Sequence, residues 1–165
     1  MTAVREASRD DINLIQKIAH ETWYPTYQEI ISHQQIEYML DLFYSKEALL
    51  ANFNEGQRFF LAEESGEIAG FTAVHHIHFE TRQITRIPKI YILPIYQGRG
   101  IGNSLLQKVE ELAVANGSVA ISLNVNRKNL AQHFYKKAGF EIVASEDINI
   151  GCGWLMEDYI MEKNV

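Results

Sequence analysis

The chain has 165 residues, 47% of them hydrophobic, and we expect residues 1–165 to form one domain around a single core. No stretch approaches the roughly 18 apolar residues of a membrane-spanning helix, and Met1–Asp11 lacks the apolar centre of an export signal. A net charge of −6 argues against nucleic acid or an anionic membrane as partner. Cys152 is the only cysteine, which excludes an internal disulfide and favours the cytoplasm.

The first third of the chain is predicted to be mostly helical, after a short strand over residues 3–6. Ser8 and Asp11 have the spacing of a helix start. Apolar residues then recur at helical spacing, at Ile12, Ile15, Ile18 and Ala19. Pro25 is expected to break this helix, so residues 23–31 are predicted to be an aromatic loop.

Two more helices and then a strand meander are predicted to follow. Ser32 and Gln35 repeat the helix-start spacing and indicate a helix to about Leu42, and another is expected over 45–54. Ser65-Gly66 marks a hairpin turn. The strands expected around it cover residues 58–64, 68–78 and 83–92.

The last third of the chain alternates between strand and helix patterns. A helix opens at Ile101 and is expected to end at Asn116-Gly117. A strand over residues 119–125, a second helix and two strands over residues 141–150 and 154–162 complete the pattern. A meander followed by strand, helix and strand predicts an α/β fold of three layers, α-β-α, with a mixed sheet.

A glycine-rich turn separates the meander from the next helix, and it is the strongest functional signal. It reads Gln97, Gly98, Arg99, Gly100, Ile101, Gly102 and Asn103. Glycines at alternate positions allow positive φ and close approach to a ligand, and N–H groups at a helix start attract an anion. The turn lacks the lysine of a Walker A loop and the third glycine of a dinucleotide fingerprint. It therefore predicts a pyrophosphate site of another kind, or a structural turn without a ligand.

A second motif runs without a gap from Asn129 to Phe140 and has the form N-x-x-A-x-x-F-Y-x-x-x-G-F. With the Q-x-x-G-x-G pattern of Gln97–Gly102, it resembles the GNAT superfamily of acetyl-CoA-dependent N-acetyltransferases. Segments 21–40 and 156–163 also resemble bacterial members of the spermidine/spermine type. The resemblance implies a mostly antiparallel central sheet splayed between its fourth and fifth strands, and a homodimer is common in the resembled group.

The resemblance also implies a set of acetyl-CoA contacts. The turn Gln97–Asn103 would hold the pyrophosphate, and the backbone of Ile92 and Leu93 would face the pantetheine and thioester, with the Ile92 N–H polarising the acetyl carbonyl. Asn129 would bond the pantetheine or simply cap a helix. Tyr135 would be the general acid for the departing thiolate, with Phe134 beside it as a cofactor contact. An aromatic pair packed in the core is the other interpretation of Phe134-Tyr135.

The general base is less clear, because Pro88 stands where many relatives carry a glutamate. Glu80, His76 or His78 acting through water are candidates, and ordered water with backbone carbonyls is the default. His76 and His78 share one strand face but lack further ligands, so we expect no metal. Cys152, between two glycines, is expected in a turn rather than as a nucleophile.

Together these features predict an N-acetyltransferase that moves acetyl directly from acetyl-CoA to a primary amine in a ternary complex. A small cationic amine or polyamine is favoured by the net charge and by the acids Glu21, Glu29, Glu37 and Asp41. Four aromatic residues could form either core or an acceptor-side wall: Trp23, Tyr24, Tyr27 and Tyr38. The alternative is a noncatalytic acyl-CoA-binding sensor or regulatory module, and amino acids, aminoglycosides and peptide N-termini stay open as acceptors.

Overall fold

A seven-stranded sheet in the order β1-β2-β3-β4-β5-β7-β6 organises the computed structural model, which describes residues 2–165. Every neighbouring pair is antiparallel except β4 and β5. The strands are β1 (Thr2–Glu6), β2 (Arg58–Glu64), β3 (Glu67–Phe79), β4 (Arg82–Ile92), β5 (Ala120–Asn126), β6 (Glu141–Gly151) and β7 (Trp154–Asn164). The predicted mixed sheet is confirmed.

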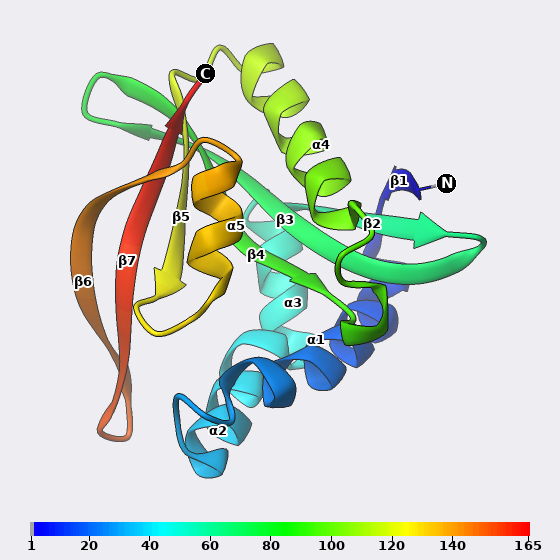
Figure 1. The fold of residues 1–165 in the computed structure, drawn as a ribbon, viewed down its shortest axis with the longest axis vertical. Helices are drawn as coiled ribbons and strands as arrows, with labels where there is room; N and C mark the ends of the chain where they lie inside the picture. Colours follow the sequence, from blue (N-terminus) through cyan, green and yellow to red (C-terminus); the bar gives the residue numbers. More distant parts are fainter. Residues whose placement is uncertain (1) are drawn as a thin grey trace.

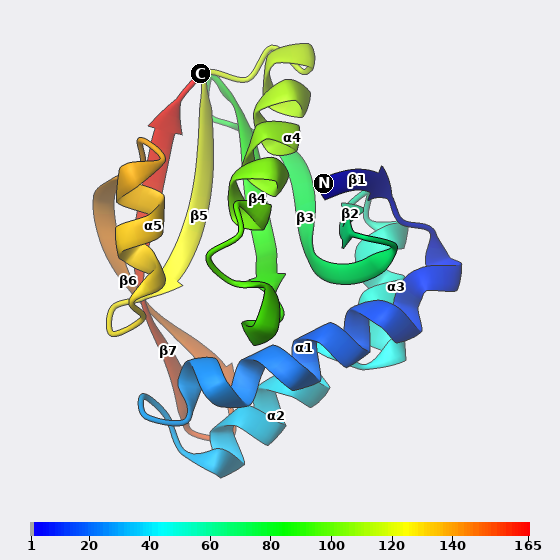
Figure 2. The same cartoon turned by 45° about the vertical axis from the view of Figure 1, so that its right-hand side comes forward.

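Helices cover both faces of the sheet and make it the middle of three layers (Figures 1 and 2). One face carries α4 (Ile101–Ala115) and α5 (Ala131–Lys137). The other face carries α1 (Ile12–Tyr27), α2 (His33–Tyr44) and α3 (Lys46–Asn54). Short 3₁₀ turns, η1 (Arg9–Asp11) and η2 (Pro94–Tyr96), precede α1 and follow β4. Among residues 2–165, no helix is long and apolar enough to cross a membrane.

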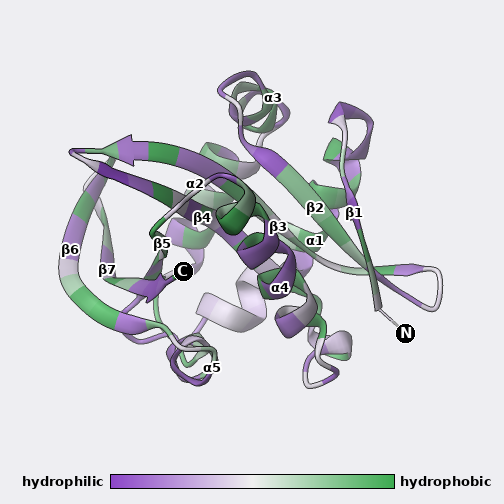
Figure 3. Ribbon diagram, turned by 90° about the horizontal axis from the view of Figure 1, so that it is seen from above, coloured by the Kyte–Doolittle hydropathy of each residue, from purple (hydrophilic) through white to green (hydrophobic). Residues whose placement is uncertain are grey.

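The hydrophobic core is divided between the two faces. One cluster packs α1, α2 and α3 onto the sheet, and Phe59, Phe71 and Tyr44 are almost fully buried in it. The other packs α4 and α5 onto the sheet around Val109 and Leu123. In Figure 3 the middle of β2 is hydrophobic and its two ends are hydrophilic, as expected for a strand covered on both faces.

Pro25 does not end the first helix, which corrects the predicted aromatic loop over residues 23–31. Helix α1 continues through Pro25 to Tyr27. Proline loses the hydrogen bond of its own N–H and its ring clashes with the carbonyl four residues earlier, but at Pro25 these costs fall in the last turn, with only two helical residues beyond it. The Thr26 hydroxyl donates to the Thr22 carbonyl at 2.7 Å, and Trp23 is only 4% exposed in the core. Tertiary packing therefore overrides the local signal.

The α2 helix is tied to the far end of the sheet by two side chains. Ser32 caps it by accepting from the Gln35 N–H, as predicted, but the Gln35 side chain donates to the Leu155 carbonyl on β7 at 2.9 Å. The Tyr38 hydroxyl donates to the Ile150 carbonyl on β6 at 2.5 Å. These contacts join the α1–α2 pair to the β6–β7 hairpin.

Candidate active site

The sheet splits between β4 and β5, and Pro88 explains where the split begins. The two strands pair only from Ile84/Ala120 to Ile87/Leu123, and they diverge beyond this point (Figure 2). Between β3 and β4 the register shifts, so that Ile87 and Pro88 together oppose Val74. Proline has no N–H for the ladder, and such a bulge bends its strand. The predicted splay between the fourth and fifth strands is thus confirmed.

The end of β4 turns the backbone of Ile92 into the split. The Leu93 N–H donates to the Ala69 carbonyl on β3 at 2.8 Å. Because hydrogen-bonded pairs alternate along an antiparallel ladder, the neighbouring pair Gly70/Ile92 is not hydrogen-bonded. The N–H and C=O of Ile92 therefore point away from β3, toward the side that β5 has left. The Ile92 carbonyl accepts a bond from the Gln97 side chain at 3.3 Å.

Leu93 does not present free backbone groups, which corrects that part of the prediction. Its N–H is bonded to β3, and its carbonyl accepts from the Tyr96 N–H at 2.9 Å in the η2 turn. Its side chain packs against the core cluster of the α1–α3 face. Leu93 directly follows Ile92, and successive residues of an extended chain face opposite ways, so the backbone groups of Leu93 point toward β3 while those of Ile92 point into the split.

The glycine turn carries a run of free backbone donors. Gly98 and Gly100 have φ of +78° and +80°, and Gly100 is the N-cap of α4. From Gly98 to Asn103, no N–H donates to a backbone or side-chain acceptor within residues 2–165. An α-helix leaves its first N–H groups without partners, and here the preceding turn adds two more. These donors and the helix dipole make a site for an anion.

Gly102 is required for packing, unlike Gly98 and Gly100, which are required for their positive φ. A Cβ at this position would lie 2.8 Å from the Phe134 ring and 3.2 Å from the Ile92 side chain. The glycine therefore lets α4 pack closely on α5 and β4, rather than on a ligand. The Arg99 side chain also turns away from the donors, toward Glu64 at 3.5 Å and over the Tyr96 ring. Arg99 contributes its N–H to the turn, and its exposed guanidinium is directed toward Glu64 in this structure.

A cavity of about 1110 Å³ fills the split and extends beneath α1 and α2. Most of the predicted cofactor and catalytic residues line it. They are Ile92, Gln97, Gly98, Gly100, Ile101, Gly102, Asn103, Asn129, Phe134 and Tyr135. Leu93 and Arg99 do not line it.

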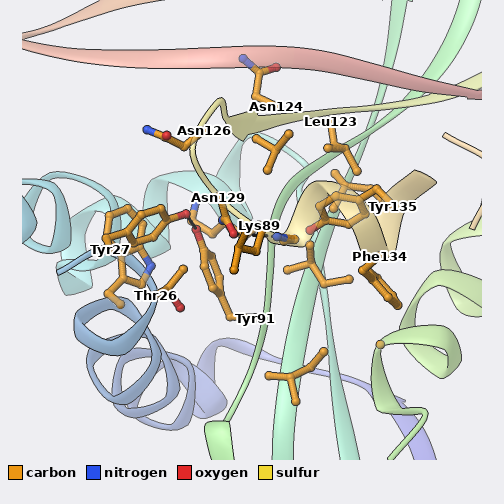
Figure 4. A pocket seen from close by; sticks show the side chains of 18 of the residues that line it. Thr26, Tyr27, Lys89, Tyr91, Leu123, Asn124, Asn126, Asn129, Phe134 and Tyr135 are labelled. Carbon is orange, nitrogen blue, oxygen red and sulfur yellow. Dashed lines mark hydrogen bonds between the residues drawn. The ribbon is translucent and has the colours of Figure 1, made fainter. Parts of the chain in front are cut away.

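Tyr135 reaches into this cavity from α5 (Figure 4). Its ring packs between Phe134 and Phe140, so the core interpretation holds for the ring. Burial raises the pKa of its hydroxyl, and no hydrogen-bond partner holds that hydroxyl within residues 2–165. The group is therefore protonated at neutral pH and free to donate.

Tyrosine hydroxyls from α1 and β4 meet opposite Tyr135. Those of Tyr27 and Tyr91 are 2.9 Å apart, and the Asn129 side chain lies beside them (Figure 4). Burial raises the pKa of Tyr27 to about 12. Asn129 lies one residue before Leu130, the N-cap of α5, so it is not the N-cap that was one of its two expected roles. Its side chain nevertheless accepts from the N–H of Ala131, the first residue of the helix, at 2.9 Å, and it also lines the cavity.

The proposed bases Glu80, His76 and His78 do not line this cavity, so the structure does not support that prediction. His78 bonds Gln83 at the β3–β4 hairpin, and Glu80 is in the turn itself. Gln83 precedes Ile92 by nine residues, and a strand rises roughly 3.3 Å per residue, so about 30 Å separates them. None of the three lines the cavity.

The predicted acids and aromatics are divided between two places. Trp23, Tyr27 and Glu29 line the large cavity. Tyr24, with Glu37 and Asp41, lines a separate hollow of about 380 Å³ between α1 and α2, and Glu21 lines neither. Tyr38 is bonded to β6, so the aromatic wall consists of Trp23 and Tyr27, joined by Tyr44 and Tyr91.

Three charged residues of the cavity were not singled out from the sequence: the exposed Lys128 and two buried ones, Lys89 and Asp158. Lys89 is 9% exposed, donates to Asn52 on α3 at 2.9 Å, and lies over the Tyr44 ring. Asp158 on β7 is 6% exposed. The burial of Lys89 could have been suspected from the sequence, because this lysine stands inside the apolar run of β4. Nothing in the alternating pattern of β7 distinguishes Asp158 from its neighbours.

Replacing Lys89 with methionine should change how stability depends on pH. Burial lowers the pKa of Lys89 from 10.5 to about 8. Between these values the unfolded chain binds more protons than the native protein, so stability rises with pH. Relative to Lys89→Met, the wild-type free energy of unfolding should gain about 3 kcal/mol from pH 8 to 10.5. Urea unfolding across this range measures it, and parallel profiles would contradict the buried cation.

Comparisons with known proteins agree with this geometry. The model of the acetyltransferase (GNAT) domain matches residues 27–157. A spermidine N(1)-acetyltransferase of Thermoplasma acidophilum is 28% identical over 162 residues, covering 97% of this chain and 95% of the relative. An uncharacterized N-acetyltransferase of Bacillus subtilis is 30% identical over 164 residues, covering 93% of each.

A solved structure also superposes over the whole chain. The crystal structure of the PaiA N-acetyltransferase of Thermoplasma acidophilum in complex with coenzyme A has a TM-score of 0.83 at 28% identity, and it covers 100% of this chain and 99% of its own. The family model spans both the glycine turn and the α5 motif. This chain belongs to the GNAT family of acetyl-CoA-dependent N-acetyltransferases.

Proposed function

We propose that this enzyme acetylates a small cationic primary amine, with a polyamine as the first candidate, by direct transfer in a ternary complex. One observation carries the proposal. A single cavity brings together a turn of free N–H donors, an inward-facing strand N–H and a protonated tyrosine. These are the groups that acetyl transfer from a thioester requires.

We assign the cofactor contacts from the positions of the backbone N–H groups that have no partner. The N–H groups of Gly98–Asn103 would hold the pyrophosphate of acetyl-CoA, which supplies the activated acetyl group. The Ile92 N–H, pointing into the split, would donate to the acetyl oxygen as negative charge develops there. Phe134 and Asn129 would contact the pantetheine between these two points.

The chain's side chains suit transfer without a covalent enzyme intermediate. Tyr135 would protonate the departing thiolate, which its protonated, unbonded hydroxyl can do. No cysteine competes as a nucleophile, because Cys152 is exposed in the turn between β6 and β7. The incoming amine must attack as the free base, and water is the proposed first acceptor of its proton.

The cationic acceptor is supported by charge and by one relative. The protein carries a net charge of −6, and Glu29 and Asp158 are the carboxylates lining the cavity within residues 2–165. Tyr27, whose ring packs on the buried Trp23, offers an aromatic face on which an alkylammonium can rest. A relative of 28% identity is named a spermidine N(1)-acetyltransferase.

An acceptor panel tests the proposed substrate class. Spermidine, an aminoglycoside and a peptide with a neutral tail should be compared by CoA release with acetyl-CoA as donor. We expect kcat/KM to be highest for spermidine and to fall as salt rises, because salt screens the attraction between charges. A preference for the peptide, or a salt-independent rate with spermidine, would contradict the cationic acceptor. CoA binding without turnover of any amine would favour the sensor alternative.

Location and assembly are part of the same proposal. A chain with one cysteine suits a reducing compartment, so the cytoplasm is the proposed location. A homodimer, common in the resembled group, is the proposed assembly, and sedimentation of the purified protein tests it.

A further inference from the structure

We propose that Asp158 binds a second ammonium group of the acceptor, so that the enzyme selects diamines and polyamines over monoamines. This inference rests on the proposed function and names the residue that would set its specificity. Asp158 lies on β7, opposite Asn126 of β5, on the far side of the split from β4. It lines the same cavity as Tyr27 and Tyr135.

The carboxylate of Asp158 is buried without a bonded cation. One oxygen, Oδ2, accepts from the Asn124 side chain at 3.2 Å, and no salt bridge joins Asp158 to any residue in the described part of the chain. Carboxylates are almost never this deeply buried unless they are paired. A cation that enters the cavity would supply the missing partner.

Both arginines near Asp158 are committed to other groups. Arg86 donates to the Ser122 hydroxyl at 2.6 Å and to the Asn124 side chain at 2.8 Å. Arg127 pairs with Asp147 at 2.7 Å and Glu157 at 3.3 Å, and it reaches only the backbone carbonyl of Asp158. Neither arginine therefore pairs with the Asp158 carboxylate, although Asp158 lines the cavity.

The free protein is strained electrostatically at this position. Burial raises the pKa of Asp158 above its ordinary value and Glu146 adds to the rise, against the opposing effects of Asn124, Arg127 and Arg86. A carboxylate that stabilised the fold through its charge would have a lowered pKa instead. The buried negative charge of Asp158 therefore destabilises the protein while the cavity is empty, and a bound ammonium would offset this destabilisation.

Lys89 sets the direction of a bound polyamine. Its ammonium lies at the α3 side of the cavity, bonded to Asn52. A second cation would be repelled from that side and attracted to Asp158 across the split. Tyr27 would flank the chain between them, since its hydroxyl is close enough for the Asp158 charge to raise its pKa.

The test compares Asp158→Asn with two amines of the same length. The amines 1,4-diaminobutane and n-pentylamine differ only in an ammonium in place of a methyl group. Wild-type kcat/KM should favour the diamine by about tenfold or more, the usual value of a charged hydrogen bond. Asp158→Asn should reduce that ratio at least tenfold, mainly through KM. Glu157→Gln removes the neighbouring charge, 59% exposed outside the cavity, and should keep the ratio.

Two further measurements separate this role from others. Calorimetry with the CoA-saturated protein should show weaker diamine binding in Asp158→Asn, independent of turnover. Its unfolding midpoint should equal or exceed that of the wild type, because a costly charge is removed while the isosteric amide can still accept from Asn124.

Each other result overturns the inference in a recognisable way. An equal loss of kcat for both amines would make Asp158 a proton acceptor. An unchanged ratio, or a lower unfolding midpoint with unchanged diamine binding, would make it a structural residue. In each of these cases the proposed function stands. Failure of the wild type to acetylate any amine would overturn the proposed function together with this inference.

Discussion

Gly100→Glu is expected to abolish detectable binding of CoA while the protein stays folded. Gly100 is the N-cap of α4, and a Cβ there would meet nothing within 4 Å, so a side chain projects into open space without a clash. A carboxylate at this point would repel the pyrophosphate and compete for the free N–H groups. Loss of several charge-assisted bonds should weaken binding by more than about 100-fold.

Two control variants separate charge from backbone strain. A non-glycine residue at φ +80° costs about 1–2 kcal/mol whatever its side chain. Gly100→Ala has that strain without the charge and should keep most of the affinity. Gly66→Glu places the same residue at φ +82° in the β2–β3 turn, also in open space, and should bind CoA as the wild type does. Calorimetry on all three, with circular dichroism for the fold, makes the comparison. Undiminished affinity in folded Gly100→Glu would remove the turn from the cofactor site.

The parts of the site that could be predicted are those whose backbone needs a particular residue. Gly98 and Gly100 have positive φ, and a turn that needs glycine is visible in a sequence. The motif from Asn129 to Phe140 was informative for the same reason, because cap, aromatic pair and closing glycine have fixed positions along a short helix. Both motifs line or border the cavity.

The parts that could not be predicted depend on register and on distant packing. Whether Ile92 or Leu93 faces the split is decided by strand parity, which the register shift opposite Val74 changes. Pro88 was seen only as a missing carboxylate, although it also marks where β4 leaves β5. Asp158 is buried because β5 and β7 pair beside the cavity, a contact that no local pattern reports.

The errors have physical causes that a sequence could partly have supplied. His76 and His78 were considered as bases for their chemistry, yet the length of their hairpin already separates them from the end of β4. Pro25 was expected to break its helix as a proline in a helix interior does, whereas it lies in the last turn of α1. In both cases geometry along the element, rather than residue type, decides the outcome.

Tyr135→Phe is expected to lower kcat by about 10²–10⁴-fold, the usual effect of losing a positioned acid. The hydroxyl lines the cavity and is protonated at neutral pH, because burial raises its pKa. Since it bonds nothing in residues 2–165, its removal should leave the affinity for acetyl-CoA and the free energy of unfolding nearly unchanged. The ring would stay packed between Phe134 and Phe140.

The variant also distinguishes proton donation from packing. Tyr159→Phe removes a hydroxyl from a half-buried tyrosine on β7 that does not line the cavity, and it should turn over at the wild-type rate. If Tyr135 protonates the thiolate, the loss in Tyr135→Phe should shrink with a thioester donor whose thiol is more acidic, because such a thiolate leaves without help. Single-turnover kinetics with both donors measure the chemical step directly. Wild-type turnover, or an equal loss with both donors, would mean that water supplies the proton and that Tyr135 only shapes the cavity.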